Sequence, residues 1–285
     1  MHQELKTSYS FKIMWQLCRL HQPRGILLLC WPVWTALWIT QANTFLWVVM
    51  TLGAAAMRTL GCLINDYCDQ DIDGHVWRTQ QRPLATGQAS VRMWLFAVMV
   101  SSLIALGCLL ALPKVCWYWS LVIIPWVMIY PTAKRWCPLP QVILACVFSS
   151  GIPMVFLASV GVLNAACWLL TMIHVFWIFA YDTQYALADL KDDMGLSIFS
   201  SAKTLGVYTQ SAINGCYAMV IIFSLLLSWY LGVHWLQGPM LVILALGFYR
   251  THKLTCDGDE RKALKAFLWN NHLNAWLFFM WVLTV

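Results

Sequence analysis

Long apolar segments alternate with short polar ones along almost the whole chain, from Gly25 to the C-terminus. Each apolar segment has the length of a membrane span, since roughly 20 residues of helix cross a hydrocarbon core about 30 Å thick. Nine spans are predicted, at residues 25–41, 44–64, 93–112, 115–133, 139–161, 163–185, 211–231, 235–250 and 265–284. The pattern therefore predicts an all-α polytopic membrane protein with about nine transmembrane helices.

The composition supports a membrane location, because 61% of the 285 residues are hydrophobic and only 11% are charged. A soluble domain carries roughly a quarter charged residues, so this chain lacks the polar side chains to cover a water-facing surface. Its 11 cysteines are scattered without a C-x-x-C pair, so no disulfide framework is expected. No Pro-, Gly- or Ser-rich linker divides the chain, and a single domain is predicted over residues 1–285, with 1–24 as a cytoplasmic N-terminal segment.

The net charge of +6 comes from basic residues whose positions along the chain match a membrane topology. Lys and Arg residues precede the first predicted span and recur in every second loop after it, whereas the intervening loops carry only Lys114. This positive-inside pattern places the N-terminus and the basic loops in the cytoplasm and the C-terminus outside. Because topology accounts for the basic residues, no nucleic-acid partner is expected.

Acidic residues are concentrated in two short windows, which hold eight of the 12 Asp and Glu side chains. They are Asp66, Asp69, Asp71 and Asp73 in the first window and Asp182, Asp189, Asp192 and Asp193 in the second. Both windows lie at predicted cytoplasmic helix ends, where an acid opposes the helix dipole and a charge near the bilayer is unfavourable. A functional site explains these residues better than a solvated loop does.

The spacing within each window sharpens this interpretation. If a helix continues through the first window, Asn65, Asp66, Asp69 and Asp73 share one face; Asp182, Tyr185, Asp189 and Asp193 form a similar stripe in the second. Crowded carboxylates repel one another unless a cation joins them. Mg²⁺, which shares its oxygen ligands between carboxylates and substrate phosphates, is the expected cofactor.

Basic residues follow the acids along the chain. Arg78 and Arg82 lie just beyond the first window, and Lys134 and Lys203 are predicted on the same membrane side, which indicates a site for a phosphate ester. Arg58 precedes Asn65 by seven residues, or roughly 10 Å of helix deeper into the bilayer. It is either a buried partner of one Asp or, as we favour, the counter-charge for a carboxylate on a second substrate.

Two long motifs can be read from these residues. The first, N-D-x-x-D-x-x-x-D, runs from Asn65 to Asp73, and the second, D-x-x-Y-A-x-x-D-x-x-D-D, runs from Asp182 to Asp193. Together with Tyr130-Pro131, Lys134-Arg135 and Leu139-Pro140-Gln141, they resemble the UbiA superfamily of intramembrane prenyltransferases, and within it the 4-hydroxybenzoate polyprenyltransferases of ubiquinone synthesis. The segment from His21 to Gly25 departs from the family's acid-Lys-Pro-x-Gly form, so no N-terminal cation is assigned to the diphosphate.

The resemblance implies a single UbiA-like domain of nine helices around a central cavity, in the bacterial inner membrane with its active site facing the cytoplasm. It implies Mg²⁺ ligands, which are Asp66, Asp69, Asp73, Asp182 and Asp189. It implies substrate-binding residues, which are Arg58, Asn65, Arg78, Arg82, Lys134 and Tyr185. Asp189 or Asp193 would act as the base while a polyprenyl group passes from polyprenyl diphosphate to 4-hydroxybenzoate, with the isoprenoid tail in membrane lipid.

Two alternatives stay open. The first is a prenyltransferase of the same superfamily with another acceptor, such as homogentisate, dihydroxynaphthoate or a porphyrin. The second is a cation transporter, whose acids should lie at mid-bilayer depth beside broken helices. No obligate protein partner is evident, and the sequence does not determine the isoprenoid length.

Overall fold

The computed structural model describes residues 2–233 and 237–285, and the side chains from residue 10 onward within those ranges. The regular structure of these residues is entirely helical. The elements in chain order are α1 (His2–Leu17), α2 (Pro23–Ile39), α3 (Thr44–Cys68), α4 (Gln70–Asp73), α5 (Val91–Leu110), α6 (Lys114–Ile129), η1 (Tyr130–Arg135), α7 (Pro140–Ser149), α8 (Gly151–Ser159), α9 (Ala165–Ala188), α10 (Leu190–Met194), α11 (Ser201–Leu205), η2 (Gly206–Tyr208), α12 (Thr209–Leu231), α13 (Gln237–Thr255) and α14 (Glu260–Thr284).

Six helical segments of the described chain are long and apolar enough to cross a membrane, so the protein is an integral membrane protein. They are Thr44–Cys68, Val91–Leu110, Lys114–Arg135, Pro140–Ser159, Ala165–Ala188 and Ser201–Leu231. The predicted count of nine spans is not confirmed, because α2 is a shorter apolar helix and α13 and α14 are not among the six. Residues 235 and 236 of the eighth predicted span lie outside the described residues.

The fifth predicted span, residues 139–161, is divided into α7 and α8. Pro153 has no N–H to donate to the carbonyl of Ser149 four residues earlier, so one helical hydrogen bond is missing at this break. Gly151 starts the second half, and a β-carbon there would lie 2.8 Å from Cγ2 of Val33. The break therefore coincides with a close approach between α8 and α2 that only glycine permits.

Helix α9 forms the centre of the bundle and packs against α7, α12 and α14. Asn270 of α14 joins three of these elements, because its Oδ1 accepts hydrogen bonds from Trp177 Nε1 at 2.8 Å and Tyr217 OH at 3.1 Å. Its Nδ2 donates to Gln184 Oε1 at 2.9 Å. Hydrogen bonds between helices fix their relative rotation where apolar contact alone does not. This network holds α9, which carries the second acidic window, in place.

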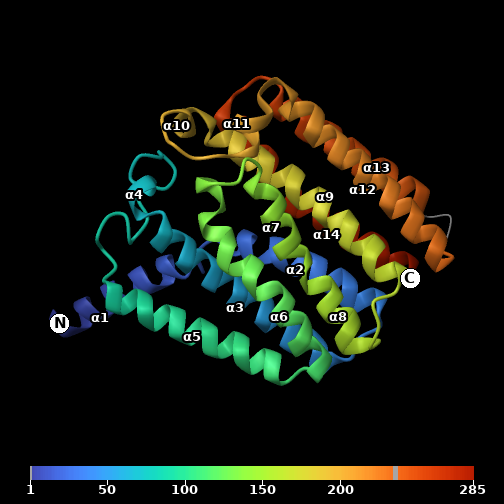
Figure 1. The fold of residues 1–285 in the computed structure, drawn as a ribbon, viewed down its shortest axis with the longest axis horizontal. Helices are drawn as coiled ribbons and strands as arrows, with labels where there is room; N and C mark the ends of the chain where they lie inside the picture. The colour runs from blue at the N-terminus through green and yellow to red at the C-terminus, as the bar shows by residue number, and fades with distance from the viewer. Residues whose placement is uncertain (1, 234–236) are drawn as a thin grey trace.

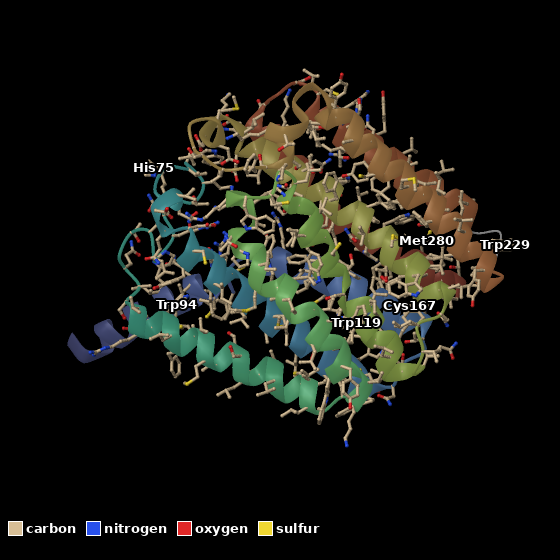
Figure 2. All side chains as sticks on the ribbon, in the orientation of Figure 1. His75, Trp94, Trp119, Cys167, Trp229 and Met280 are labelled. Carbon is tan, nitrogen blue, oxygen red and sulfur yellow. The ribbon has the colours of Figure 1, made fainter. Side chains whose placement is uncertain are left out.

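The short helices that follow the two acidic windows gather at one end of the bundle. Figure 1 shows α4, α10 and α11 at this end and the C-terminus at the opposite end. Figure 2 places His75, just after α4, far from Trp229 near the end of α12. The two windows, 116 residues apart in the sequence, therefore meet at the same end of the molecule.

Candidate active site

Asp69 and Asp189 occupy equivalent positions at the ends of the two central helices. Each directly follows the last residue of a long helix, α3 or α9, and precedes a short one, α4 or α10. Their backbone angles are nearly the same, with φ −107° and ψ 8° at Asp69 and φ −101° and ψ 0° at Asp189. The helix assumed in the spacing argument is therefore interrupted in each window, because both aspartates adopt the bridge conformation common in active sites.

One pocket lies between these helix ends, with about 810 Å³ of empty space including its open mouth. Five aspartates from both windows line it, namely Asp69, Asp73, Asp182, Asp189 and Asp193. Other residues singled out by the sequence line it as well, namely Asn65, Arg78, Arg82, Lys134 and Tyr185. The structure thus brings together ten of the residues predicted for the site, whereas Asp66 and Arg58 do not line this pocket.

The acids of the first window are paired with basic side chains. Lys134 Nζ lies 2.8 Å from Asp69 Oδ2, to which Asn65 Nδ2 also donates a hydrogen bond of 2.8 Å. Arg82 NH1 lies 2.6 Å from Asp73 Oδ2 and 3.0 Å from Asp66 Oδ1. Burial raises the pKa values of the Asp69 and Asp73 carboxyls, while these cations oppose the rise. Asp66, Asp69 and Asp73 therefore form a buried charge cluster rather than part of a solvated loop.

Arg19 supplies a cation to the first window that the sequence did not reveal. Its NH2 lies 2.5 Å from Asp66 Oδ1, and it follows α1 in a left-handed conformation with φ 56°. Ile13 and Leu17 of α1 are buried against the bundle, so the helix that precedes Arg19 is docked. The sequence pattern carried no signal for this contact, because it depends on a single left-handed residue between two helices.

The second window is joined to the loop that follows the first. Arg78 donates from Nε to Asp189 Oδ1 at 2.9 Å and from NH2 to Asp189 Oδ2 at 2.5 Å, in a two-pronged contact. Its guanidinium carbon also lies 4.1 Å from the ring centroid of Tyr185. The backbone N–H of Trp77 donates to Asp192 Oδ2 at 2.9 Å. Residues 77 and 78 therefore close one side of the pocket by connecting the two windows.

Lys203, which the sequence places on the same membrane side as the acids, has a structural role. Its Nζ donates to the carbonyl oxygens of Asp193, Leu196 and Ile198, at 3.0, 3.0 and 2.8 Å. An ammonium group has three N–H donors, and all three are used by these carbonyls. Lys203 therefore stabilises the loop after α10, which has no regular structure between Met194 and Ser201.

Asp193 lies on α10, directly before this stabilised loop, and is buried at the pocket wall. Burial raises the pKa of its carboxyl to about 6, and the neighbouring charge of Asp189 adds to the rise. Asp193 forms no ion pair within the part of the chain that the structure describes, whereas both oxygens of Asp189 are bound by Arg78. The two residues predicted as alternative bases therefore have different environments.

Arg58 lies deeper along α3 and is held against apolar and glycine residues. Its guanidinium carbon lies 5.8 Å from the ring centroid of Phe148. A β-carbon at Gly25 would come within 3.1 Å of Arg58 NH2, so glycine leaves room for this side chain. None of the ion pairs formed by residues 10–233 and 237–285 includes Arg58. The less favoured alternative, a direct ion pair with one Asp, is therefore not seen among these residues, although the charge of Arg58 acts on the carboxyl of Asp182.

The oxygen atoms at the pocket are suited to a hard divalent cation. Asp69 Oδ1 is buried and has no hydrogen-bond partner among the residues that the structure describes, and both arginines that bind Asp66 contact its Oδ1. Carboxylate oxygens that remain free in a buried site fit Mg²⁺. Among the described residues, no three Asp, Glu, His or Cys side chains are already gathered around one point. Metal binding by these aspartates therefore stays a prediction, one that requires side chains to turn away from their arginine and lysine partners.

Comparison with known proteins agrees with this architecture. The UbiA prenyltransferase family matches residues 29–283. The chain is 39% identical to the 4-hydroxybenzoate octaprenyltransferase of Aromatoleum aromaticum, over 92% of this chain and 90% of that protein. It is 37% identical to the protein of the same name from Nitrosomonas eutropha, over 95% and 96% of the two chains.

Two solved structures show the same fold. A UbiA homolog from Aeropyrum pernix K1 superposes with a TM-score of 0.76 at 21% identity, over 88% of this chain and 95% of that one. A UbiA homolog from Archaeoglobus fulgidus, bound to GPP and Mg²⁺, has a TM-score of 0.70 at 16% identity, over 94% and 99% of the chains. The family match over nearly the whole sequence and the shared fold lead to one conclusion: the chain belongs to the UbiA prenyltransferase family.

Proposed function

We propose that this protein transfers a polyprenyl group from polyprenyl diphosphate to the ring carbon ortho to the hydroxyl of 4-hydroxybenzoate, a step of ubiquinone biosynthesis. The observation that carries the proposal is the single pocket in which two aspartate windows face each other beside Arg78, Arg82 and Lys134. The relatives named 4-hydroxybenzoate octaprenyltransferase, at 34–39% identity over nearly the whole chain, support this acceptor.

The pocket suits a diphosphate because basic side chains and aspartates both line it. Arg78, Arg82 and Lys134 lie at the pocket and present donors to an anion, which stabilises negative charge as it develops on a leaving diphosphate. Mg²⁺ would supply further charge neutralisation when bound. Its proposed ligands are Asp66, Asp69, Asp73, Asp182 and Asp189. Asn65 would orient Asp69, to which it already donates a hydrogen bond.

The reaction then breaks the bond between the allylic carbon and the diphosphate oxygen, and the electron pair leaves with the diphosphate. The allylic cation lies beside aromatic rings, of which Tyr130 and Tyr185 line the pocket. The acceptor's ring carbon forms the new C–C bond and then loses its proton. Asp193 is the better base of the two candidates, because it is at the pocket wall while both oxygens of Asp189 are bound by Arg78.

We propose that Arg58 binds the carboxylate of the acceptor. It lies on α3, two helical turns deeper than Asn65, and it forms no ion pair with a carboxylate of the described residues. This depth would place the aromatic ring below the diphosphate and the isoprenoid tail in membrane lipid. We place the pocket on the cytoplasmic side of the bacterial inner membrane, because the basic loops share this end of the bundle.

The test is a prenylation assay on membranes that contain the protein. Labelled 4-hydroxybenzoate is incubated with Mg²⁺ and prenyl diphosphates of increasing length, and labelled lipid-soluble product is measured. Homogentisate and dihydroxynaphthoate are tested in parallel as acceptors. We expect product from 4-hydroxybenzoate; product from another acceptor alone would refute the proposed substrate, and no product from any acceptor would refute the reaction.

A further inference from the structure

Gln141 is a buried polar residue at the pocket wall with only one end of its carboxamide in use. It stands at the start of α7, lines the pocket together with Asp69 and Lys134, and is 7% exposed. Its Oε1 accepts a hydrogen bond of 2.9 Å from the backbone N–H of Ser201. Its Nε2 has no hydrogen-bond partner among the described residues of the chain. The Nε2 atom is not one of the fully buried atoms that lack a partner, so it is open to the pocket, where a ligand or water can accept its hydrogen bond.

The bond to Ser201 determines which end of the carboxamide is available. An amide group presents an acceptor at one end and a donor at the other, and Oε1 is committed to a backbone N–H that can only donate. Ser201 itself is held, because its Oγ donates to Thr183 Oγ1 at 2.9 Å and Thr183 Oγ1 donates to the carbonyl of Phe179 at 2.7 Å. This series of hydrogen bonds, from α9 through Ser201 to Gln141, fixes the carboxamide so that its Nε2 donor is the group available at the pocket.

The position of Gln141 indicates which substrate accepts this hydrogen bond. It shares the pocket with the aspartates of both windows and with Lys134, whereas Arg58, the proposed acceptor anchor, does not line this pocket. Phosphate oxygens are acceptors only, so they match a group that can only donate. The other pocket residues near Gln141 on the chain, Pro140 and Pro131, have no N–H to offer.

We propose that Gln141 contacts the substrate: its Nε2 donates a hydrogen bond to a diphosphate oxygen of the prenyl donor, and the backbone N–H of Ser201 holds the carboxamide in that orientation. Ser201 is therefore a positioning residue. This inference rests on the proposed use of a prenyl diphosphate, but it does not depend on which aromatic acceptor is prenylated.

The first experiment measures binding of geranyl diphosphate in the presence of Mg²⁺ to purified wild-type protein and to Gln141→Leu and Gln141→Glu. A hydrogen bond to a charged acceptor is lost, so the Kd should rise by about 10- to 100-fold in both variants, while the KM for 4-hydroxybenzoate stays within about twofold. Gln141→Glu keeps an oxygen for the Ser201 N–H and so guards against a variant that fails to fold. An unchanged Kd for geranyl diphosphate in a folded variant would overturn the assignment, as would an effect on the acceptor alone.

The second experiment uses two substitutions at Ser201. Ser201 is the first residue of α11, where proline is tolerated, and Ser200 already has extended angles of φ −150° and ψ 156°, as a residue before proline requires. Ser201→Pro deletes the N–H that binds Gln141 and the hydroxyl; the matched control Ser201→Ala deletes only the hydroxyl. We expect Ser201→Pro to raise the Kd about threefold or more, and Ser201→Ala, which keeps the N–H but loses the bond to Thr183, to raise it by clearly less.

Combining the Ser201→Pro and Gln141→Leu substitutions tests whether Ser201 acts by positioning Gln141. Ser201→Pro should add nothing in the Gln141→Leu background, because the carboxamide that it positions is absent. An equal effect in both backgrounds would show that Ser201 acts independently and would overturn the positioning role. Failure of the wild-type protein to bind geranyl diphosphate would overturn both this inference and the proposed function, whereas binding without prenylation of 4-hydroxybenzoate would overturn only the proposed acceptor.

Discussion

Asp69 offers the sharpest test of the proposed site, because replacing it with Asn changes its charge and almost nothing else. The carboxylate is 2% exposed, and its Oδ2 accepts from Lys134 and Asn65, both at 2.8 Å. An Asn oxygen can keep these two hydrogen bonds. The group that replaces the unpartnered Oδ1 is then an NH₂, which repels a cation and cannot ligate it.

The expected effects on catalysis and stability are therefore very different. Losing one preorganised electrostatic contact lowers kcat by about 10²–10³-fold, or roughly 3–4 kcal/mol, so turnover of Asp69→Asn should fall below about 1% of wild type. The free energy of unfolding should change by no more than about 1 kcal/mol, because the hydrogen bonds persist and Lys134 is partly exposed. Thermal unfolding in detergent measures this second quantity.

The matched control is Asp71→Asn in the same segment. Asp71 is 66% exposed, pairs only with Arg135 at 3.3 Å among the described residues, and does not line the pocket. Its replacement should leave the initial rate of prenylation close to wild type. If Asp69→Asn keeps a tenth or more of the wild-type rate, or if Asp71→Asn loses as much as Asp69→Asn, the assignment of Asp69 to the reaction is wrong.

Three further outcomes are expected. Arg58→Ala should raise the KM for the aromatic acid by about 10- to 100-fold while the KM for the prenyl diphosphate stays constant, and an equal rise in both would move Arg58 to the phosphate site. Lys203→Met should lower the Tm and increase proteolysis between residues 194 and 201, because three loop carbonyls lose their donor; unaltered cleavage would argue against the stabilising role. Treatment with a chelator should abolish turnover and added Mg²⁺ should restore it, so full activity in the chelator would contradict the cofactor assignment.

Much of the fold could be predicted because the bilayer imposes a length on each apolar segment. Spans at 44–64, 93–112 and 163–185 correspond to α3, α5 and α9 with small shifts at their ends. The interruption between α7 and α8 was missed, because hydropathy measures composition and ignores the hydrogen bond that Pro153 cannot make. Hydropathy likewise could not show that α3 continues past residue 64, since Asn65 and Asp66 are polar helical residues outside the apolar run.

The site could be predicted where residues share a motif, but not where tertiary structure brings them together. The distribution of the basic loops predicted both windows on the same membrane side, and residues of both windows line one pocket. Arg19 and Lys203 could not be assigned correctly, because every basic residue near a membrane surface satisfies the same topological rule. Only the distances in the structure show that Arg19 neutralises Asp66, whereas Lys203 stabilises a loop by binding its carbonyl oxygens.

The docking of α1 has a practical consequence for handling the protein. Phe11 and Trp15 stack with ring centroids 6.1 Å apart and are exposed, while the opposite side of the same helix is buried and leads directly to Arg19. A truncation that begins at Pro23 would preserve every apolar helix and still remove a guanidinium from Asp66. Affinity tags and fusion partners therefore belong at the C-terminus, at the far end of the bundle from the two acidic windows (Figure 1).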